Sequence, residues 1–94
     1  MDTQEAKSLL TEELAKYRAR SYADLVAIIG EAERAEITGP SGKRYQVEVN
    51  ALWDARVGGD VRVMASIDDG GLRAIVPLSD NFIKAPDGTF IGEG

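Results

Sequence analysis

The spacing of apolar residues changes from helical to alternating at about residue 33, and this change restricts the chain to helices followed by a sheet. Apolar residues recur at three- and four-residue intervals over residues 3–19, which is typical of a helix with one buried face. A shorter apolar segment opens at Ser21 and ends at Gly30, residue types that cap helices at their two ends. Two N-terminal helices are therefore expected.

Asp2 and Glu5 form a start signal for the first helix. An Asp at the N-cap accepts a hydrogen bond from a backbone N–H in the first turn, and a Glu three residues later can return one to the cap. The pair therefore predicts a capping box in which the Glu5 carboxylate is used locally.

Beyond residue 33 apolar and polar residues alternate in runs that turn-forming residues separate. The runs are a weaker one that ends at Ile37, followed by residues 45–53, 61–67 and 72–78. The turns, rich in Gly, Pro, Asp and Ser, are at residues 39–42, 54–60 and 69–70. This rhythm predicts strands joined by short connections.

The pairing of these strands follows from residue numbers. Pairing Trp53 with Val61 across the 54–60 loop places apolar residues opposite one another along both strands. If Asp69-Gly70 is a two-residue type I′ turn, Ile67 pairs with Leu72, and Val61 pairs with Leu78. The two registers together give one continuous apolar sheet face.

We therefore predict a single α+β domain over residues 1–94. Two N-terminal helices pack on one face of a four-stranded antiparallel meander. A C-terminal strap or hairpin follows, because Ala85-Pro86-Asp87-Gly88 carries Pro and Gly at their preferred turn positions. The apolar residues that this segment would pack against the sheet edge or a neighbouring chain are Phe82, Ile83, Phe90 and Ile91.

Composition excludes several function classes. The chain has no cysteine and no histidine, so thiol nucleophiles, Ser-His pairs and the usual zinc ligands are absent. Its net charge of −5, from 16 acidic and 11 basic residues, disfavours nucleic acid and anionic membranes as partners. We expect no catalytic residue and no cofactor. Without an apolar span or a secretory signal, the expected location is the cytoplasm.

The predicted register gives the sheet a second face that is not uniformly polar. Its apolar members are Leu52, Met64 and Ile75. The polar residues that surround them are Glu48, Asn50, Arg62 and Arg73. An apolar centre with a charged rim is typical of protein interfaces. The sequence therefore predicts a non-enzymatic protein-interaction module that acts through this face or through a homodimer. In the alternative, the C-terminal strap covers this face through Phe82 and Phe90.

Two other functions stay open. A small-molecule-binding or enzymatic domain would have a pocket between the helices and the sheet, near Tyr45 and Trp53. Such a pocket would need a volume of at least ~300 Å³ and a convergent polar group such as Glu48 or Asp54, with Tyr17 as a further lining residue. The acidic charge also fits an inhibitor that caps a basic partner. If no ligand binds there, we expect Trp53 to be part of the hydrophobic core.

The acidic stretch Asp68-Asp69-Gly70-Gly71 invites a calcium interpretation. An EF-hand loop needs acidic residues at alternating positions closed by a Glu, and that pattern is absent. Asp and Gly are also ordinary turn residues. The stretch therefore predicts a turn and no metal site.

Several short segments resemble a family of short, uncharacterised bacterial domains. They are Trp53-Asp54, GDVRV at 59–63, SIDDGG at 66–71, PLS at 77–79, PDG at 86–88 and FIGE at 90–93. The resemblance extends from about residue 22 onward and leaves the first helix as a variable extension. It implies a bacterial, cytoplasmic setting, and it brings no activity, cofactor or site residue.

Overall fold

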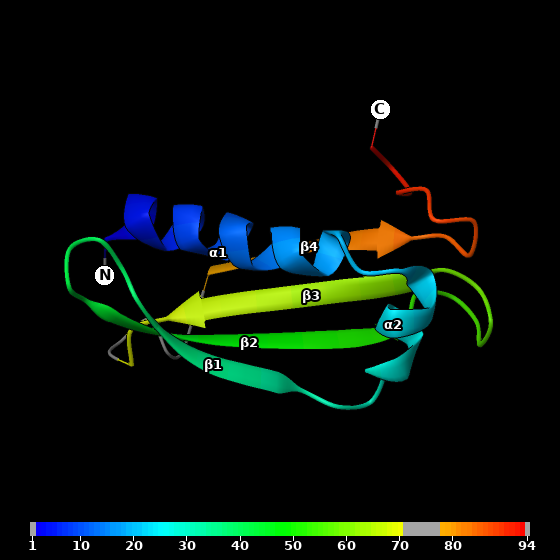
Figure 1. Ribbon diagram of the computed structural model, residues 1–94, viewed down its shortest axis with the longest axis horizontal. Coiled ribbons are helices and arrows are strands. Elements are labelled where there is room, and N and C mark those ends of the chain that lie inside the picture. Colours follow the sequence, from blue (N-terminus) through cyan, green and yellow to red (C-terminus); the bar gives the residue numbers. More distant parts are fainter. Residues whose placement is uncertain (1, 71–77, 94) are drawn as a thin grey trace.

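The computed structural model describes residues 2–70 and 78–93, and its fold is the α+β meander that the sequence predicts (Figure 1). The elements are α1 Thr3–Arg18, α2 Tyr22–Ala27, β1 Glu33–Thr38, β2 Arg44–Trp53, β3 Val61–Asp68 and β4 Leu78–Lys84. The strands form one four-stranded sheet in the order β1-β2-β3-β4, and each neighbouring pair is antiparallel. Both helices lie against the same sheet face.

The first helix begins and buries its apolar stripe as expected. The Asp2 side chain accepts a hydrogen bond of 3.0 Å from the Glu5 backbone N–H. Ala6, Leu10, Leu14 and Tyr17 are the buried residues of α1. Only one half of the predicted capping box is present, the hydrogen bond to Asp2. The Glu5 carboxylate binds the β1–β2 connection and not the cap.

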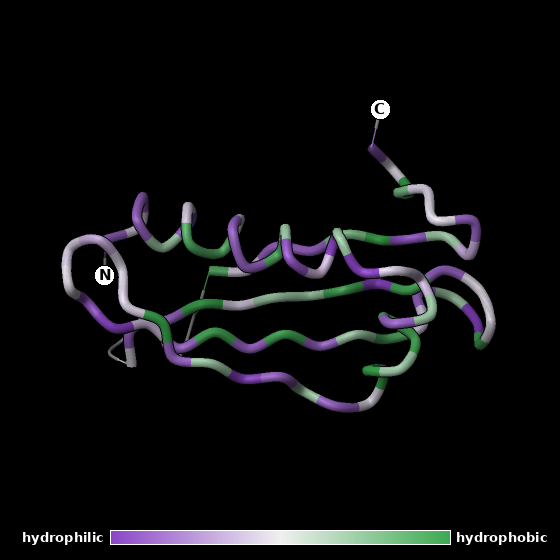
Figure 2. Tube along the Cα trace, viewed as in Figure 1, coloured by the Kyte–Doolittle hydropathy of each residue, from purple (hydrophilic) through white to green (hydrophobic). Residues whose placement is uncertain are grey.

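The β2–β3 register is confirmed, since Trp53 pairs with Val61 and Val47 with Ile67. Figure 2 shows the alternation of hydrophilic and hydrophobic residues along β2. The buried core residues are Ala6, Leu10, Leu14, Tyr17, Leu25, Tyr45, Val47, Val49, Ala51, Val61, Val63, Ala65, Ile67 and Phe82. The inner face of the sheet and the stripe of α1 thus form one core.

The predicted pairing of the last two strands is wrong. Ile67 pairs with Leu78 and Val61 with Lys84, so the strand beside β3 is 78–84 and not 72–78. This pairing places Phe82 opposite Val63, and Phe82 is only 2% exposed. A phenylalanine buries more apolar surface at this position than a valine would. Residues 72–77 of the expected strand lie outside the described residues.

The two-residue turn at Asp69-Gly70 is also wrong. A type I′ turn needs positive φ at both central residues. Gly70 has φ +80°, but no described residue other than glycine has a positive φ. The Asp68 carboxylate instead accepts a hydrogen bond of 2.8 Å from the Gly70 N–H, which is a local turn within the connection.

The C-terminal segment forms the predicted hairpin. The Gly88 N–H donates to the Ala85 carbonyl at 2.8 Å, and the Ile91 N–H donates to the Ile83 carbonyl at 2.9 Å. The Phe90 ring meets Phe82 edge-on, with centroids 5.7 Å apart, on the helix side of the sheet. The alternative in which Phe82 and Phe90 cover the outer sheet face is therefore wrong.

Helix α1 is fastened to the sheet at both ends. Near its N-terminus the Glu5 carboxylate accepts hydrogen bonds from the Ser41 N–H at 2.9 Å and from the Ser41 and Tyr45 hydroxyls at 2.7 Å each. Beyond its C-terminus the buried Lys84 ammonium donates to the carbonyls of Arg18 and Arg20 at 3.2 and 2.7 Å. Side chains of β2 and β4 thus set the position of the helix.

Candidate functional site: a groove between α1 and β1

A groove lies between α1 and the β1 side of the sheet. Helix α1 packs on β3 and β4, and β1 is at the opposite edge of the sheet (Figure 1). The groove has a volume of about 410 Å³. Its lining residues are Glu13, Tyr17, Glu33, Arg34, Ala35, Val47 and Val49. The strand that no helix covers thus forms one wall of the groove.

Tyr17 and Glu33 join the two walls at one end of the groove. The Tyr17 hydroxyl donates to the Glu33 carboxylate at 2.5 Å. The Arg20 guanidinium lies 4.3 Å above the Tyr17 ring and 3.5 Å from the same carboxylate. Burial, followed by the hydrogen bond and charge of Glu33, raises the pKa of Tyr17 to about 12. Tyr17 therefore stays a neutral hydrogen-bond donor near pH 7.

Glu13 adds a second carboxylate to the helix wall. Its side chain is only 15% exposed, and its ion pair of 2.7 Å is with Lys16, which is 67% exposed. The buried Val47 and Val49 form the apolar floor. An apolar floor between two carboxylates suits a ligand that combines an aliphatic part with a cation.

Five of the seven predicted interface residues lie together on the outer sheet face, and Arg73 and Ile75 lie outside the described residues. The five are Glu48, Asn50, Leu52, Arg62 and Met64. The predicted row of Met64 beside Ile75 is wrong, because Asn81 is opposite Met64. The apolar residues of the described outer face are Leu52 and Met64, which are 40% and 43% exposed, and the partly buried Ile83 opposite Arg62.

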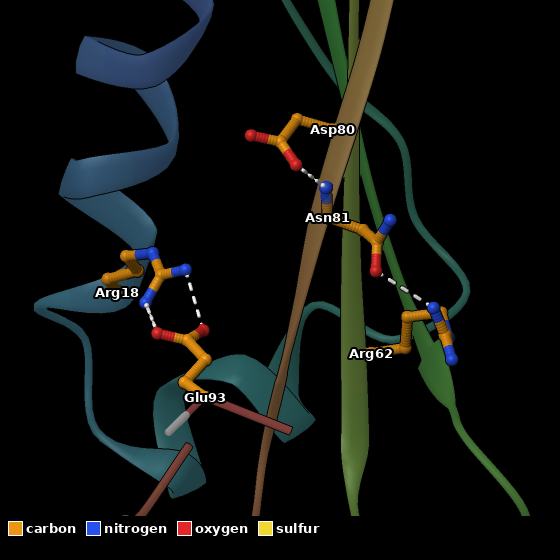
Figure 3. A network of polar contacts seen from close by, with 5 residues as sticks. All are labelled: Arg18, Arg62, Asp80, Asn81 and Glu93. Atoms are coloured by element: carbon orange, nitrogen blue, oxygen red, sulfur yellow. Dashed lines mark hydrogen bonds and ion pairs between the residues drawn. The ribbon is translucent and has the colours of Figure 1, made fainter. Parts of the chain in front are cut away.

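The charged residues Arg62 and Glu48 of the described outer face bond their neighbours. Arg62 donates to Asp54 at 2.9 Å. It also donates to Asn81 at 2.8 Å, and Figure 3 shows this second contact. Hydrogen bonds from Asn50, followed by those from Arg34, hold the pKa of Glu48 below its ordinary range. The charged groups of the described outer face are therefore bonded to neighbouring polar side chains.

The groove is not at the place predicted for a pocket, near Tyr45 and Trp53. Tyr45 is fully buried against Glu5, and the half-buried Trp53 packs on the core, as expected without a ligand. Glu48 and Asp54 lie on the outer face, so Tyr17 alone of the predicted pocket residues lines the groove.

Sequence reasoning missed four groove residues, Glu13, Glu33, Arg34 and Ala35. The signal was present at one of them. Glu33 occupies the same alternating set as Ile37, which faces the core, so a charge there marks a place where the inner face is open.

Hydrogen bonds lower the pKa of four carboxyl groups among the described residues, those of Glu5, Glu48, Asp87 and Glu93. The same part of the chain contains no group of three acidic side chains that could hold a metal ion.

No family model matches the chain, and neither a curated protein nor a solved structure is significantly similar to it. The resemblance to a bacterial domain family therefore stays a prediction. In the described ranges, no helix has the length and apolar character required to cross a bilayer.

Proposed function

We propose that the protein is a non-enzymatic protein-interaction module whose binding surface is the groove between α1 and β1. The observation that carries this proposal is the groove itself, with two partly shielded carboxylates above a valine floor. The partner is a basic protein that inserts a Lys or Arg side chain with an apolar neighbour.

The charges of the groove support a basic partner. Among the described residues the ion pair of Glu13 is with the exposed Lys16, an arrangement of modest strength that a partner's cation can replace. Glu33 accepts from Tyr17 and also pairs with Arg20 at 3.5 Å, and its side chain is 39% exposed. A net charge of −5 steers a basic partner toward the protein as a whole.

The groove is favoured over the outer face because Glu13, whose ion pair is with the exposed Lys16, can exchange its partner more readily than the charged groups of the outer face. On the outer face Arg62 and Glu48 each have two partners among neighbouring side chains. A partner that docked there would have to replace these bonds. Burial of Leu52, Met64 and the partly exposed Ile83 would offset little of that cost.

Selection of peptides from a displayed library of random dodecamers tests the proposal. Peptides that bind the immobilised protein should combine Lys or Arg with aliphatic residues. They should bind the double variant Glu13→Gln/Glu33→Gln at least about tenfold more weakly, because a hydrogen bond to a charged group contributes about 1.5–3 kcal/mol.

Glu12→Gln is the matched control, since Glu12 is the exposed neighbour of Glu13 and does not line the groove. It should leave peptide binding within about twofold, because exposed charges contribute little. Equal binding of the selected peptides to wild type and to the double variant would refute the groove as the site.

The volume of the groove favours a small molecule as the second candidate. About 410 Å³ lies within the usual range of roughly 300–1,000 Å³ for ligand pockets. Fragments screened by amide chemical shifts would then move the signals of Val47 and Val49, and peptide selection would yield no binder. An enriched peptide family that competes with the fragments would instead support a protein partner.

A further inference from the structure

We propose that two copies of this chain pair edge to edge through β1, antiparallel, about a two-fold axis at Ala35. Among the described strands β1 has one neighbour, β2, so its other edge is the end of the sheet. Exposed strand edges are templates for pairing with another strand. The argument rests on the backbone, on the register and on charge, and it does not depend on the proposed function.

The alternation of hydrogen bonds along β1 shows which backbone groups point outward. The Gly39 N–H donates to the Lys43 carbonyl at 2.8 Å, in step with the pairing of Ile37 with Tyr45. In an antiparallel pair every second residue is hydrogen-bonded to its neighbour. The backbone groups of Arg34 and Glu36 therefore point away from β2 and can bond a second strand.

The charges of β1 select one register. In a two-fold pair that continues the sheet, a residue faces one of the same parity. With Ala35 on the axis, Arg34 lies opposite Glu36 of the second copy, and the same pair recurs across the axis. An axis at Arg34 or at Glu36 would set two like charges against each other.

The side chains that would form these pairs are accessible. Arg34 is 72% and Glu36 is 51% exposed, and each already has a partner on β2, at 2.7 Å from Glu48 and 3.9 Å from Arg44. Pairing extends these contacts into a row of alternating charge across the two-fold axis. The like-for-like contact at the centre is between two alanine methyl groups, which leave room for close approach.

The dimer completes the groove. Ala35 lies on one wall of each groove, and α1 packs on β3 and β4, away from the junction. The grooves of the two copies therefore join into one trough, with Val47 and Val49 of each copy as its floor and Ala35 of both at the junction. A six-residue edge is a small contact compared with the ~1,200–2,000 Å² that stable complexes bury. We therefore expect a weak dimer with a dissociation constant of about 100 µM.

Single-cysteine variants test the register. The natural chain has no cysteine, so each variant carries one thiol. In a glutathione redox buffer at about 200 µM protein, Ala35→Cys should form a covalent dimer at least about tenfold faster than Glu36→Cys, because only residue 35 meets itself across a closely spaced pair. Both positions are exposed, so equal or reversed rates would overturn the proposal.

Sedimentation equilibrium tests the pairing without a covalent bond. Glu36→Pro removes a donor that points away from β2, a place where an edge strand tolerates proline, and should give a folded monomer. Arg34→Glu should weaken the dimer at least about fivefold, and Arg34→Glu/Glu36→Arg should restore it, with melting curves as the check on folding.

A wild-type monomer at 1 mM, or a double variant as weak as Arg34→Glu, would refute the dimer. Failure of the dimer and failure of the groove remain distinguishable. Selected peptides that still bind Glu36→Pro support the groove whatever the oligomeric state, whereas a dimer that binds no peptide supports the edge pairing alone.

Discussion

Replacement of Lys84 by methionine should destabilise the fold, although it exchanges a buried charge for an apolar side chain of similar length. Lys84 is 8% exposed, and its ammonium donates to the carbonyls of Arg18 and Arg20 at 3.2 and 2.7 Å. It also lies 5.2 Å from the centre of the Phe90 ring. These groups close the C-terminal end of α1, where backbone carbonyls have no partner within the helix.

The expected loss is about 2 kcal/mol. A hydrogen bond from a charged donor contributes about 1.5–3 kcal/mol, and Lys84 makes two. The substitution also removes the cost of burying the ammonium away from water, and this offsets part of the lost hydrogen-bond energy. For a domain of about 60–100 residues, 1 kcal/mol corresponds to roughly 4–8 °C, so the melting temperature should fall by roughly 10 °C.

Urea unfolding followed by Trp53 fluorescence measures the change, since Trp53 pairs with Val61 and Val61 with Lys84. Lys16→Met is the control, because Lys16 is 67% exposed and should change stability by less than about 0.5 kcal/mol. If Lys84→Met were as stable as wild type, the ammonium would not hold the end of α1 and the reasoning would be refuted.

Three further predictions concern the first helix and the turn after β3. Gly39→Ala should lower the melting temperature by several degrees, because its Cβ would lie 2.7 Å from the Glu5 carboxylate carbon, and in a Glu5→Ala background the same change should have little effect. Hydrogen bonds from the Ser41 side chain, then from Tyr45 and the Ser41 N–H, lower the pKa of Glu5 from 4.5, so its stabilising effect is present above about pH 4.5 and is lost as the pH falls through the folded value. The difference in melting temperature between wild type and Glu5→Gln should therefore shrink between pH 6 and pH 3, and a constant difference would contradict this account. Gly70→Val should cost about 1–3 kcal/mol by chemical denaturation, because φ is +80° there, while Asp69→Asn should change stability far less.

The helices and the β2–β3 pair could be predicted because independent signals agreed there. Caps, periodicity and turn residues all pointed to the same elements, and one residue of slip would have turned Val47 and Val63 to solvent. The β3–β4 pairing had no such check. The runs 72–78 and 78–84 both put residues of the same parity opposite β3, so alternation alone could not show that 78–84 is the strand that pairs with β3 and buries Phe82.

The groove was beyond sequence reasoning for a different reason. Periodicity shows which residues of α1 face the sheet, but it does not show which strands the helix covers. That choice is made by long-range contacts, among them the bond from Lys84 on the edge strand β4 to the end of α1. Because α1 lies on the β4 side, Glu33 and Ala35 are left in the open half of the inner face.

The two fastenings of α1 also order the events of folding. Glu5 bonds Ser41, 36 residues away, and Lys84 bonds Arg20, 64 residues away, so neither contact can form before a long loop is closed. A 16-residue helix is marginal by itself in water. Helix α1 should therefore become stable only after β2 and β4 have joined the sheet, and folding should be slow beside that of helical bundles of this size. Its slow step is the assembly of the meander, and mutations at Lys84 should accelerate unfolding while leaving the folding rate nearly unchanged.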